Sequence, residues 1–94
     1  MPASTIICVD DEPQVLNAVE RDLRSYYGAK YRIVKAGSGK AALDLLTRLK
    51  ERGDLVALFL VDQRMPGMTG TELLGEARKI YHEAKKVLLT AYAD

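Results

Sequence analysis

The feature that most constrains the fold of this chain is a regular alternation of short apolar segments with longer segments of helical periodicity. Four short segments rich in Val, Ile and Leu predict strands at 6–9, 31–36, 56–61 and 87–89. Three segments with apolar residues at helical spacing lie between them. This order predicts an α/β fold in which a parallel sheet with right-handed crossovers carries helices on both faces.

The limits of the three helices are marked by residues typical of helix starts and ends. The predicted helices run from Pro13 to Gly28, from the N-cap Ser38 to the sequence ERGD at 51–54, and from Thr69 or Thr71 to about Tyr81 and His82. Helical spacing predicts the buried faces Val15, Leu16, Val19, Leu23 and Tyr26; Ala41, Ala42, Leu45, Leu46 and Leu49; and Leu73, Leu74, Ala77 and Ile80. The strand at 31–36 is less apolar than the others, which predicts an edge position.

The composition indicates a small globular protein but does not indicate which molecule it binds. The 94 residues predict one domain, and 48% hydrophobic with 29% charged residues is typical of globular proteins. A net charge of +1 provides no basic footprint for nucleic acid or for a membrane surface, and no apolar run is long enough to cross a bilayer. The single cysteine, Cys8, excludes a disulfide within the chain and indicates a reducing compartment, so we expect a cytoplasmic protein.

Acidic residues follow two of the predicted strands. Asp10 and Asp11 come after the first strand and Asp62 after the third, while Thr90 follows the fourth. In a parallel sheet, ligands bind beyond the carboxyl ends of the strands, so the three carboxylates are expected to converge there if the first and third strands are neighbours. The three carboxylates would repel one another unless a cation lay among them. Carboxylate oxygens suit Mg²⁺, which often bridges protein to phosphate.

The pattern also indicates a chemical role for one of the acids. A carboxylate beside a divalent cation can attack a phosphoryl group and become an acyl phosphate. Asp62 stands alone on the central strand, whereas Asp10 and Asp11 form a pair suited to the metal. Asp62 is therefore the candidate nucleophile.

Three motifs in this order resemble the receiver domain of two-component response regulators: VDDEP at 9–13, LFLVDQRMPGMTG at 58–70 and VLLTAYAD at 87–94. The resemblance extends over essentially the whole chain. It implies a flavodoxin-like, doubly wound sheet with strand order 2-1-3-4, and a receiver domain over residues 1–94. It also implies a regulatory domain rather than an enzyme, with self-phosphorylation and self-dephosphorylation at most.

The resemblance assigns roles to particular residues. Asp62 is implied to be the phosphoacceptor, and Asp10, Asp11, Asp62 and the backbone carbonyl of Arg64 are implied to hold Mg²⁺. Thr90 is implied to be the switch that reorients toward the phosphoryl oxygens. The implied partners are a histidine kinase or phosphotransfer protein that donates the phosphoryl group, and an output domain that responds to it.

One part of the family pattern has no counterpart in residues 1–94. The family has a fifth strand ending in a lysine that pairs with the phosphoryl group, followed by a last helix. We therefore expect a receiver domain that is incomplete at its C-terminus. The exposed edge of the strand at 87–89 would then be open to pairing with a second copy or to a segment swap.

Other readings of the same residues stay open at this point. The acids at 10 and 11 could cap the helix that begins at Pro13, and Asp62 could belong to a turn. The sequence GSGK at 37–40 has features of a phosphate-binding loop, but lacks a full Walker pattern. Two further functions remain as alternatives: a pseudo-receiver that acts as an interaction or dimerisation module without phosphorylation, and a small phosphatase.

Overall fold

The computed structural model describes residues 4–89. The elements are β1 (Ser4–Val9), α1 (Pro13–Tyr27), β2 (Tyr31–Ala36), α2 (Gly39–Glu51), β3 (Val56–Asp62), α3 (Gly70–Ile80) and β4 (Lys85–Leu89). The predicted alternation of strands and helices is confirmed. Two strands are longer than predicted at their N-terminal ends, since β1 begins at Ser4 and β4 at Lys85.

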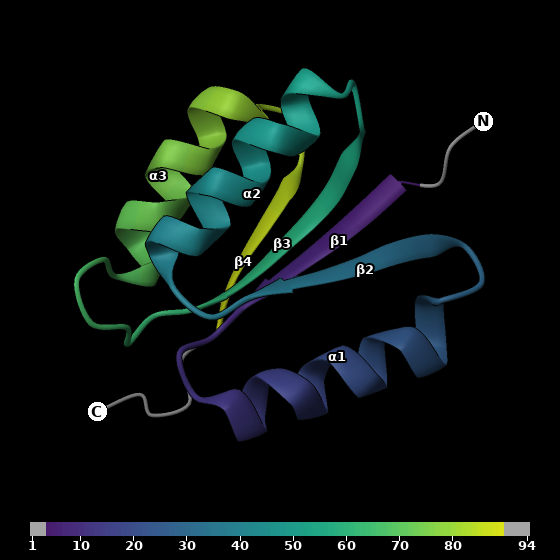
Figure 1. The fold of residues 1–94 in the computed structure, drawn as a ribbon, viewed down its shortest axis with the longest axis horizontal. Helices are drawn as coiled ribbons and strands as arrows, with labels where there is room; N and C mark the ends of the chain where they lie inside the picture. The colour runs from purple at the N-terminus through teal and green to yellow at the C-terminus, as the bar shows by residue number, and fades with distance from the viewer. Residues whose placement is uncertain (1–3, 90–94) are drawn as a thin grey trace.

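The strands form one parallel sheet in the order β2-β1-β3-β4 (Figure 1). Helix α1 covers one face, and α2 and α3 lie on the other. This is the flavodoxin-like, doubly wound arrangement. The chain winds outward from β1 in both directions, so the strand order reverses between β1 and β3, which is where open parallel sheets form a crevice at their carboxyl edge.

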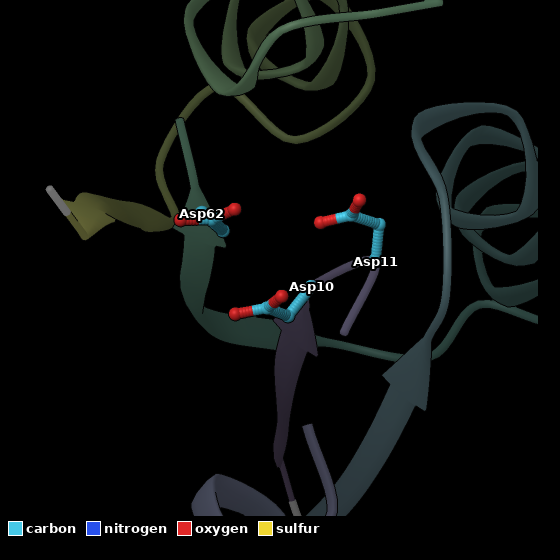
Figure 2. A group of neighbouring side chains, drawn as sticks. All are labelled: Asp10, Asp11 and Asp62. Carbon is cyan, nitrogen blue, oxygen red and sulfur yellow. The ribbon is translucent and has the colours of Figure 1, made fainter. Parts of the chain in front are cut away.

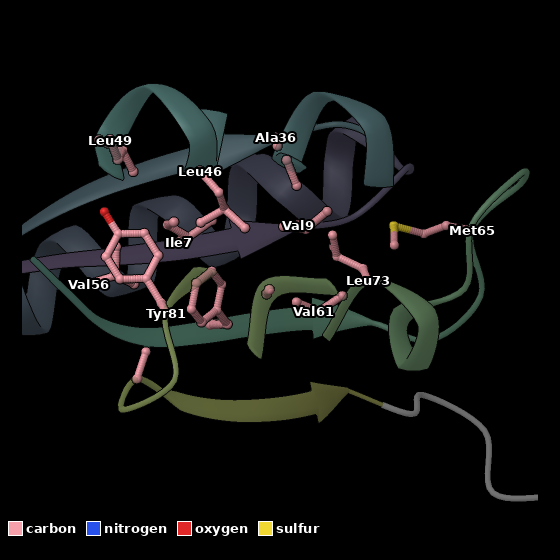
Figure 3. Packing of buried hydrophobic residues seen from close by; sticks show 14 residues of the cluster. Ile7, Val9, Ala36, Leu46, Leu49, Val56, Val61, Met65, Leu73 and Tyr81 are labelled. Carbon is pink, nitrogen blue, oxygen red and sulfur yellow. The ribbon is translucent and has the colours of Figure 1, made fainter. Parts of the chain in front are cut away.

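Alternating side chains of the central strands supply two hydrophobic cores, because successive residues of a strand point to opposite faces. Ile7 and Val9 of β1 pack with Leu46 of α2 and Leu73 of α3, and all four are almost completely buried (Figure 3). Phe59 of β3 belongs to the same cluster. The opposite face packs a smaller cluster beneath α1: Ile6, Cys8, Leu16, Leu23 and Ile33. The rigid centre of the sheet therefore holds the ends of β1 and β3 in place.

All three helices begin where the sequence signals predicted, and α1 begins at Pro13. Ser38 caps α2, with its hydroxyl oxygen accepting the N–H of Ala41 at 3.0 Å. Thr69, rather than Thr71, caps α3 in a capping box with Glu72. The N-cap of α1 is Glu12, which makes no side-chain capping bond, so the reading of Asp10 or Asp11 as N-cap is wrong.

Three residues predicted on buried helix faces are exposed instead. Val15 is 45% exposed and Tyr26 is 81% exposed, while Ala41 is also exposed. Leu16 and Leu23 point at the sheet, so Val15 and Tyr26 fall on the flank of α1 and at its last turn, where no other layer covers them. Periodicity located the apolar stripe but overestimated its width.

Candidate functional site

Three carboxylates meet at the carboxyl edge of the sheet. Asp10 and Asp11 directly follow β1, and Asp62 is the last residue of β3 (Figure 2). Each of the three offers a carboxylate oxygen, and these oxygens all lie within 4.8 Å of one another. The pairing of Val9 with Val61 places the two strand ends side by side. The predicted convergence of these acids is therefore confirmed.

Asp10 is held by its own loop. Its side chain is only 8% exposed, and its Oδ1 accepts the backbone N–H of Glu12 at 2.9 Å. This local bond turns the chain from β1 into α1 and orients the Asp10 carboxylate, a behaviour typical of Asp in turns. Asp11 is half-buried and its carboxylate points toward the same space (Figure 2).

Burial and neighbouring charge act together on Asp62. Desolvation, followed by the charges of Asp10 and Asp11, raises the pKa of the Asp62 carboxyl above its ordinary value. Hydrogen bonds from the backbone of Gln63 and Arg64 lower that pKa and only partly compensate. The charged form of Asp62 is thus less favourable here than in a free aspartate, because like charges this close repel one another. The donor set consists of hard oxygen ligands, which fits Mg²⁺.

The raised pKa of Asp62 has a consequence for stability that can be measured without metal. A carboxyl with a raised pKa in the folded state binds its proton more tightly there than in the unfolded chain, so its contribution to stability declines as pH rises from the ordinary carboxyl range through the folded-state pKa. We expect Asp62→Asn to raise the free energy of unfolding of the metal-free protein at pH 7 by up to about 1 kcal/mol.

Urea unfolding of the parent and the variant at several pH values, in EDTA, tests this expectation. The stability difference between the two proteins is expected to shrink as the pH falls below the ordinary carboxyl range, where both forms are uncharged at position 62. An Asp62→Asn variant that is less stable than the parent at pH 7 would contradict the repulsion described here.

The loop from 63 to 69 closes one side of the site. Gly67 has a φ of 82°, a left-handed conformation that follows Pro66 as in a type II turn. Met65 is buried, and Met68 packs on Gly39 at the start of α2, where an added Cβ would lie 2.8 Å from the Met68 side chain. The loop is therefore anchored on both sides of its turn. Arg64 lies in this loop with an exposed side chain, and the role of its carbonyl remains a prediction.

Two residues that sequence reasoning missed join this loop to α3. The side chain and backbone of Gln63 accept hydrogen bonds from the first turn of α3, and Gly70 packs directly on the backbone of Asp62. A glycine directly after a helix N-cap is a poor helix former, so it could have signalled a close backbone approach. No periodicity or spacing would have indicated the bonds of Gln63.

The remaining candidate residues are placed as follows. Thr90 lies outside the residues that the structure describes, directly after the end of β4. The GSGK sequence is a strand-to-helix turn in which Ser38 caps α2, which confirms the predicted N-cap. Cys8 is buried in the core, its thiol donates to the carbonyl of Val34 at 3.5 Å, and burial raises its pKa to about 11, so it has the properties of a packing residue and not of a nucleophile.

Over the described range, 4–89, the longest helices are amphipathic, and none has the length and apolar character that crossing a membrane requires.

Comparison with known proteins gives a consistent set of relatives. The family model of the response regulator receiver domain matches residues 6–94. The hydrogenase transcriptional regulatory protein HoxA of Cupriavidus necator is 34% identical over 97% of this chain, which spans 17% of that protein. Sporulation initiation phosphotransferase F of Bacillus subtilis is 39% identical over 68% of this chain, a match that covers 48% of that protein. The chain thus spans less than half the length of these relatives.

A solved structure with the same fold comes from a signalling complex. A chain in the crystal structure of the histidine kinase ThkA in complex with the response regulator protein TrrA superposes with a TM-score of 0.74 and 35% sequence identity, covering 97% of this chain and 72% of that one. The fold, the three motifs and the family match over residues 6–94 agree, and the chain therefore belongs to the receiver domain family of response regulators.

Proposed function

We propose that this domain accepts a phosphoryl group on Asp62 from a histidine kinase or phosphotransfer protein, in a Mg²⁺-dependent reaction, and passes the signal to an output domain. The observation that carries this proposal is the group of three carboxylates, with oxygens within 4.8 Å of one another, at the point where the strand order reverses. The family match and the kinase complex of a relative support the choice of donor.

In the proposed reaction, an Oδ atom of Asp62 forms a bond to phosphorus while the bond between phosphorus and the donor's histidine nitrogen breaks. The product is an acyl phosphate on Asp62 and a free donor histidine. Asp10, Asp11, Asp62 and the carbonyl of Arg64 would hold the Mg²⁺, which when bound would neutralise charge on the transferred oxygens. The buried and hydrogen-bonded Asp10 keeps its carboxylate aimed at the site before any phosphoryl donor arrives.

The same proposal covers the consequence of phosphorylation. Thr90 comes after Leu89, the last residue of β4, in the sequence. Its hydroxyl would hydrogen bond the phosphoryl oxygens and so change the surface around β4. Residues 1–94 would act as one receiver unit in the cytoplasm. Its only chemistry would be self-phosphorylation and self-dephosphorylation, as in a regulatory domain.

Intact mass spectrometry after incubation with acetyl phosphate tests the function directly. With Mg²⁺, the chain is expected to gain one phosphoryl group. With excess EDTA, the labelling rate constant is expected to fall at least about a hundredfold, because the three carboxylates then repel an incoming phosphate. Sodium chloride at equal ionic strength controls for general screening. Labelling that is equally fast in EDTA would contradict the proposed metal site, and no labelling under any condition would favour a pseudo-receiver.

A second, compatible role rests on the edge strand of the sheet. Within the described residues β4 pairs only with β3, and Lys85 and Val87 are exposed on it. Unpaired strand edges are templates for pairing with another chain. We propose that two copies associate through β4, by edge pairing or by a segment swap.

Sedimentation velocity over a range of protein concentrations tests the association. The average mass is expected to rise with concentration, and Val87→Lys, which places a charge on the exposed edge strand, is expected to reduce that rise. Val87→Thr, which keeps a β-branched residue, is the matched control. A purely monomeric parent at the highest concentration would contradict this role.

A further inference from the structure

The first turn of α3 is hydrogen bonded to the residue that follows the proposed acceptor. The N–H of Gly70 donates to the carbonyl oxygen of Gln63 at 3.0 Å, and the N–H of Thr71 donates to Gln63 Oε1 at 2.9 Å. An α-helix leaves its first N–H groups without an acceptor inside the helix. Gln63 supplies the acceptor for two of them.

Thr71 makes a second bond to the same oxygen. Its hydroxyl donates to Gln63 Oε1 at 2.8 Å, so both lone pairs of this amide oxygen are engaged. A helix cap needs only the backbone N–H bonds. The additional hydroxyl bond fixes the Gln63 side chain in one orientation across the start of the loop from 63 to 69.

The backbone of Gln63 reaches a third element. Its N–H donates to the carbonyl oxygen of Leu89, the last residue of β4, at 3.2 Å. Gln63 therefore joins the ends of β3, α3 and β4 through its N–H, its carbonyl and its side chain. The residue before it is Asp62, so these bonds fix the backbone directly after the proposed acceptor.

We infer that Gln63 is a positioning residue of the phosphoacceptor site, whose bonds to Thr71 hold the loop so that Asp62 is presented for phosphoryl transfer. This inference rests on the proposed function. An amide suits the position because it accepts two hydrogen bonds without adding charge. A carboxylate there would place a fourth negative charge beside Asp10, Asp11 and Asp62.

Three variants separate positioning from simple helix capping. Gln63→Met keeps the side-chain length but removes the amide oxygen, Thr71→Val keeps the shape and the N–H but removes the hydroxyl, and Thr71→Ser keeps both donors. For each variant we would measure three quantities: the rate constant of labelling by acetyl phosphate with Mg²⁺, the midpoint of urea unfolding, and the hydrogen exchange rate of the Thr71 amide in EDTA.

We expect Gln63→Met to label roughly three- to tenfold more slowly and Thr71→Val roughly two- to threefold more slowly than the parent. Thr71→Ser is expected to label at the parent rate. The Thr71 amide is expected to exchange at least about tenfold faster in Gln63→Met, because it has lost its acceptor. A capping role alone predicts lower urea midpoints with unchanged labelling of the folded protein.

The outcomes distinguish this inference from the proposed function. If the parent is labelled and the labelling rate constant of Gln63→Met lies within twofold of the parent's, the positioning role is overturned. The proposed function then still stands. Thr71→Ser labelling as slowly as Thr71→Val overturns the positioning role too, since the hydroxyl would then not be the cause. A parent that takes no label contradicts the proposed function itself, and with it the role of Gln63 in that reaction.

Discussion

Asp62→Asn is expected to abolish phosphoryl labelling while the protein stays folded. The side chain keeps its size, but a carboxamide is a far weaker nucleophile than a carboxylate, and the acyl phosphate described above cannot form. We expect a fall in the labelling rate constant of at least about a thousandfold, to the limit of detection by intact mass spectrometry. The variant is also expected to be more stable than the parent in the absence of metal, because one of three converging charges is removed.

Two further acids provide the controls for this experiment. Glu12→Gln removes one charge from the same loop, at a side chain that is exposed and outside the carboxylate group, and it is expected to label like the parent. Asp11→Asn is expected to slow labelling but still to place the label on Asp62. Persistent stoichiometric labelling of Asp62→Asn would show that another residue accepts the phosphoryl group, and the assignment of Asp62 would be wrong.

Gly70→Ala is expected to cause the largest loss of stability among the single substitutions considered. A Cβ at position 70 would overlap the backbone carbonyl oxygen of Asp62, and it would lie 2.6 Å from Leu88 Cδ1 and 2.9 Å from the Cα of Gln63. Two of these three atoms are backbone, so the start of α3 would have to move away from β3. We expect a loss of about 2–3 kcal/mol in the free energy of unfolding, measured by urea denaturation.

Gly75→Ala is the matched control on the same helix. Among the described residues, nothing apart from its chain neighbours and the backbone of its own helix lies within 4 Å of a Cβ built at Gly75. Glycine in a helix interior is also less favourable than alanine. This variant is expected to gain about 0.5–1 kcal/mol in stability. Since α3 is displaced only in Gly70→Ala, that variant is also expected to label more slowly than Gly75→Ala. Equal stabilities for the two variants would contradict the close approach of α3 to the acceptor.

Much of the fold and of the candidate site could be predicted because it depends on local sequence patterns. The order of strands and helices follows from periodicity, and Asp10, Asp11 and Asp62 follow short apolar segments that were predicted to be buried strands. Helix limits were predicted well where a capping residue is present, as at Ser38 and Thr69. The spacing of apolar residues was less informative about which side chains are exposed, as Val15 and Tyr26 show. The width of a buried helix face depends on which elements cover it.

The sequence by itself determined the alternating α/β pattern, the acids at the strand ends and, by its three motifs, the family. Only the tertiary structure decided how these parts meet. The distance among the three carboxylates depends on the register of β1 against β3, which is a contact between residues about fifty positions apart. The bonds of Gln63 to Thr71 and the packing of Gly70 on Asp62 likewise arise only when loop and helix are brought together. Hydrogen-bond partners and close backbone contacts follow no sequence period, because they depend on the positions of atoms in space.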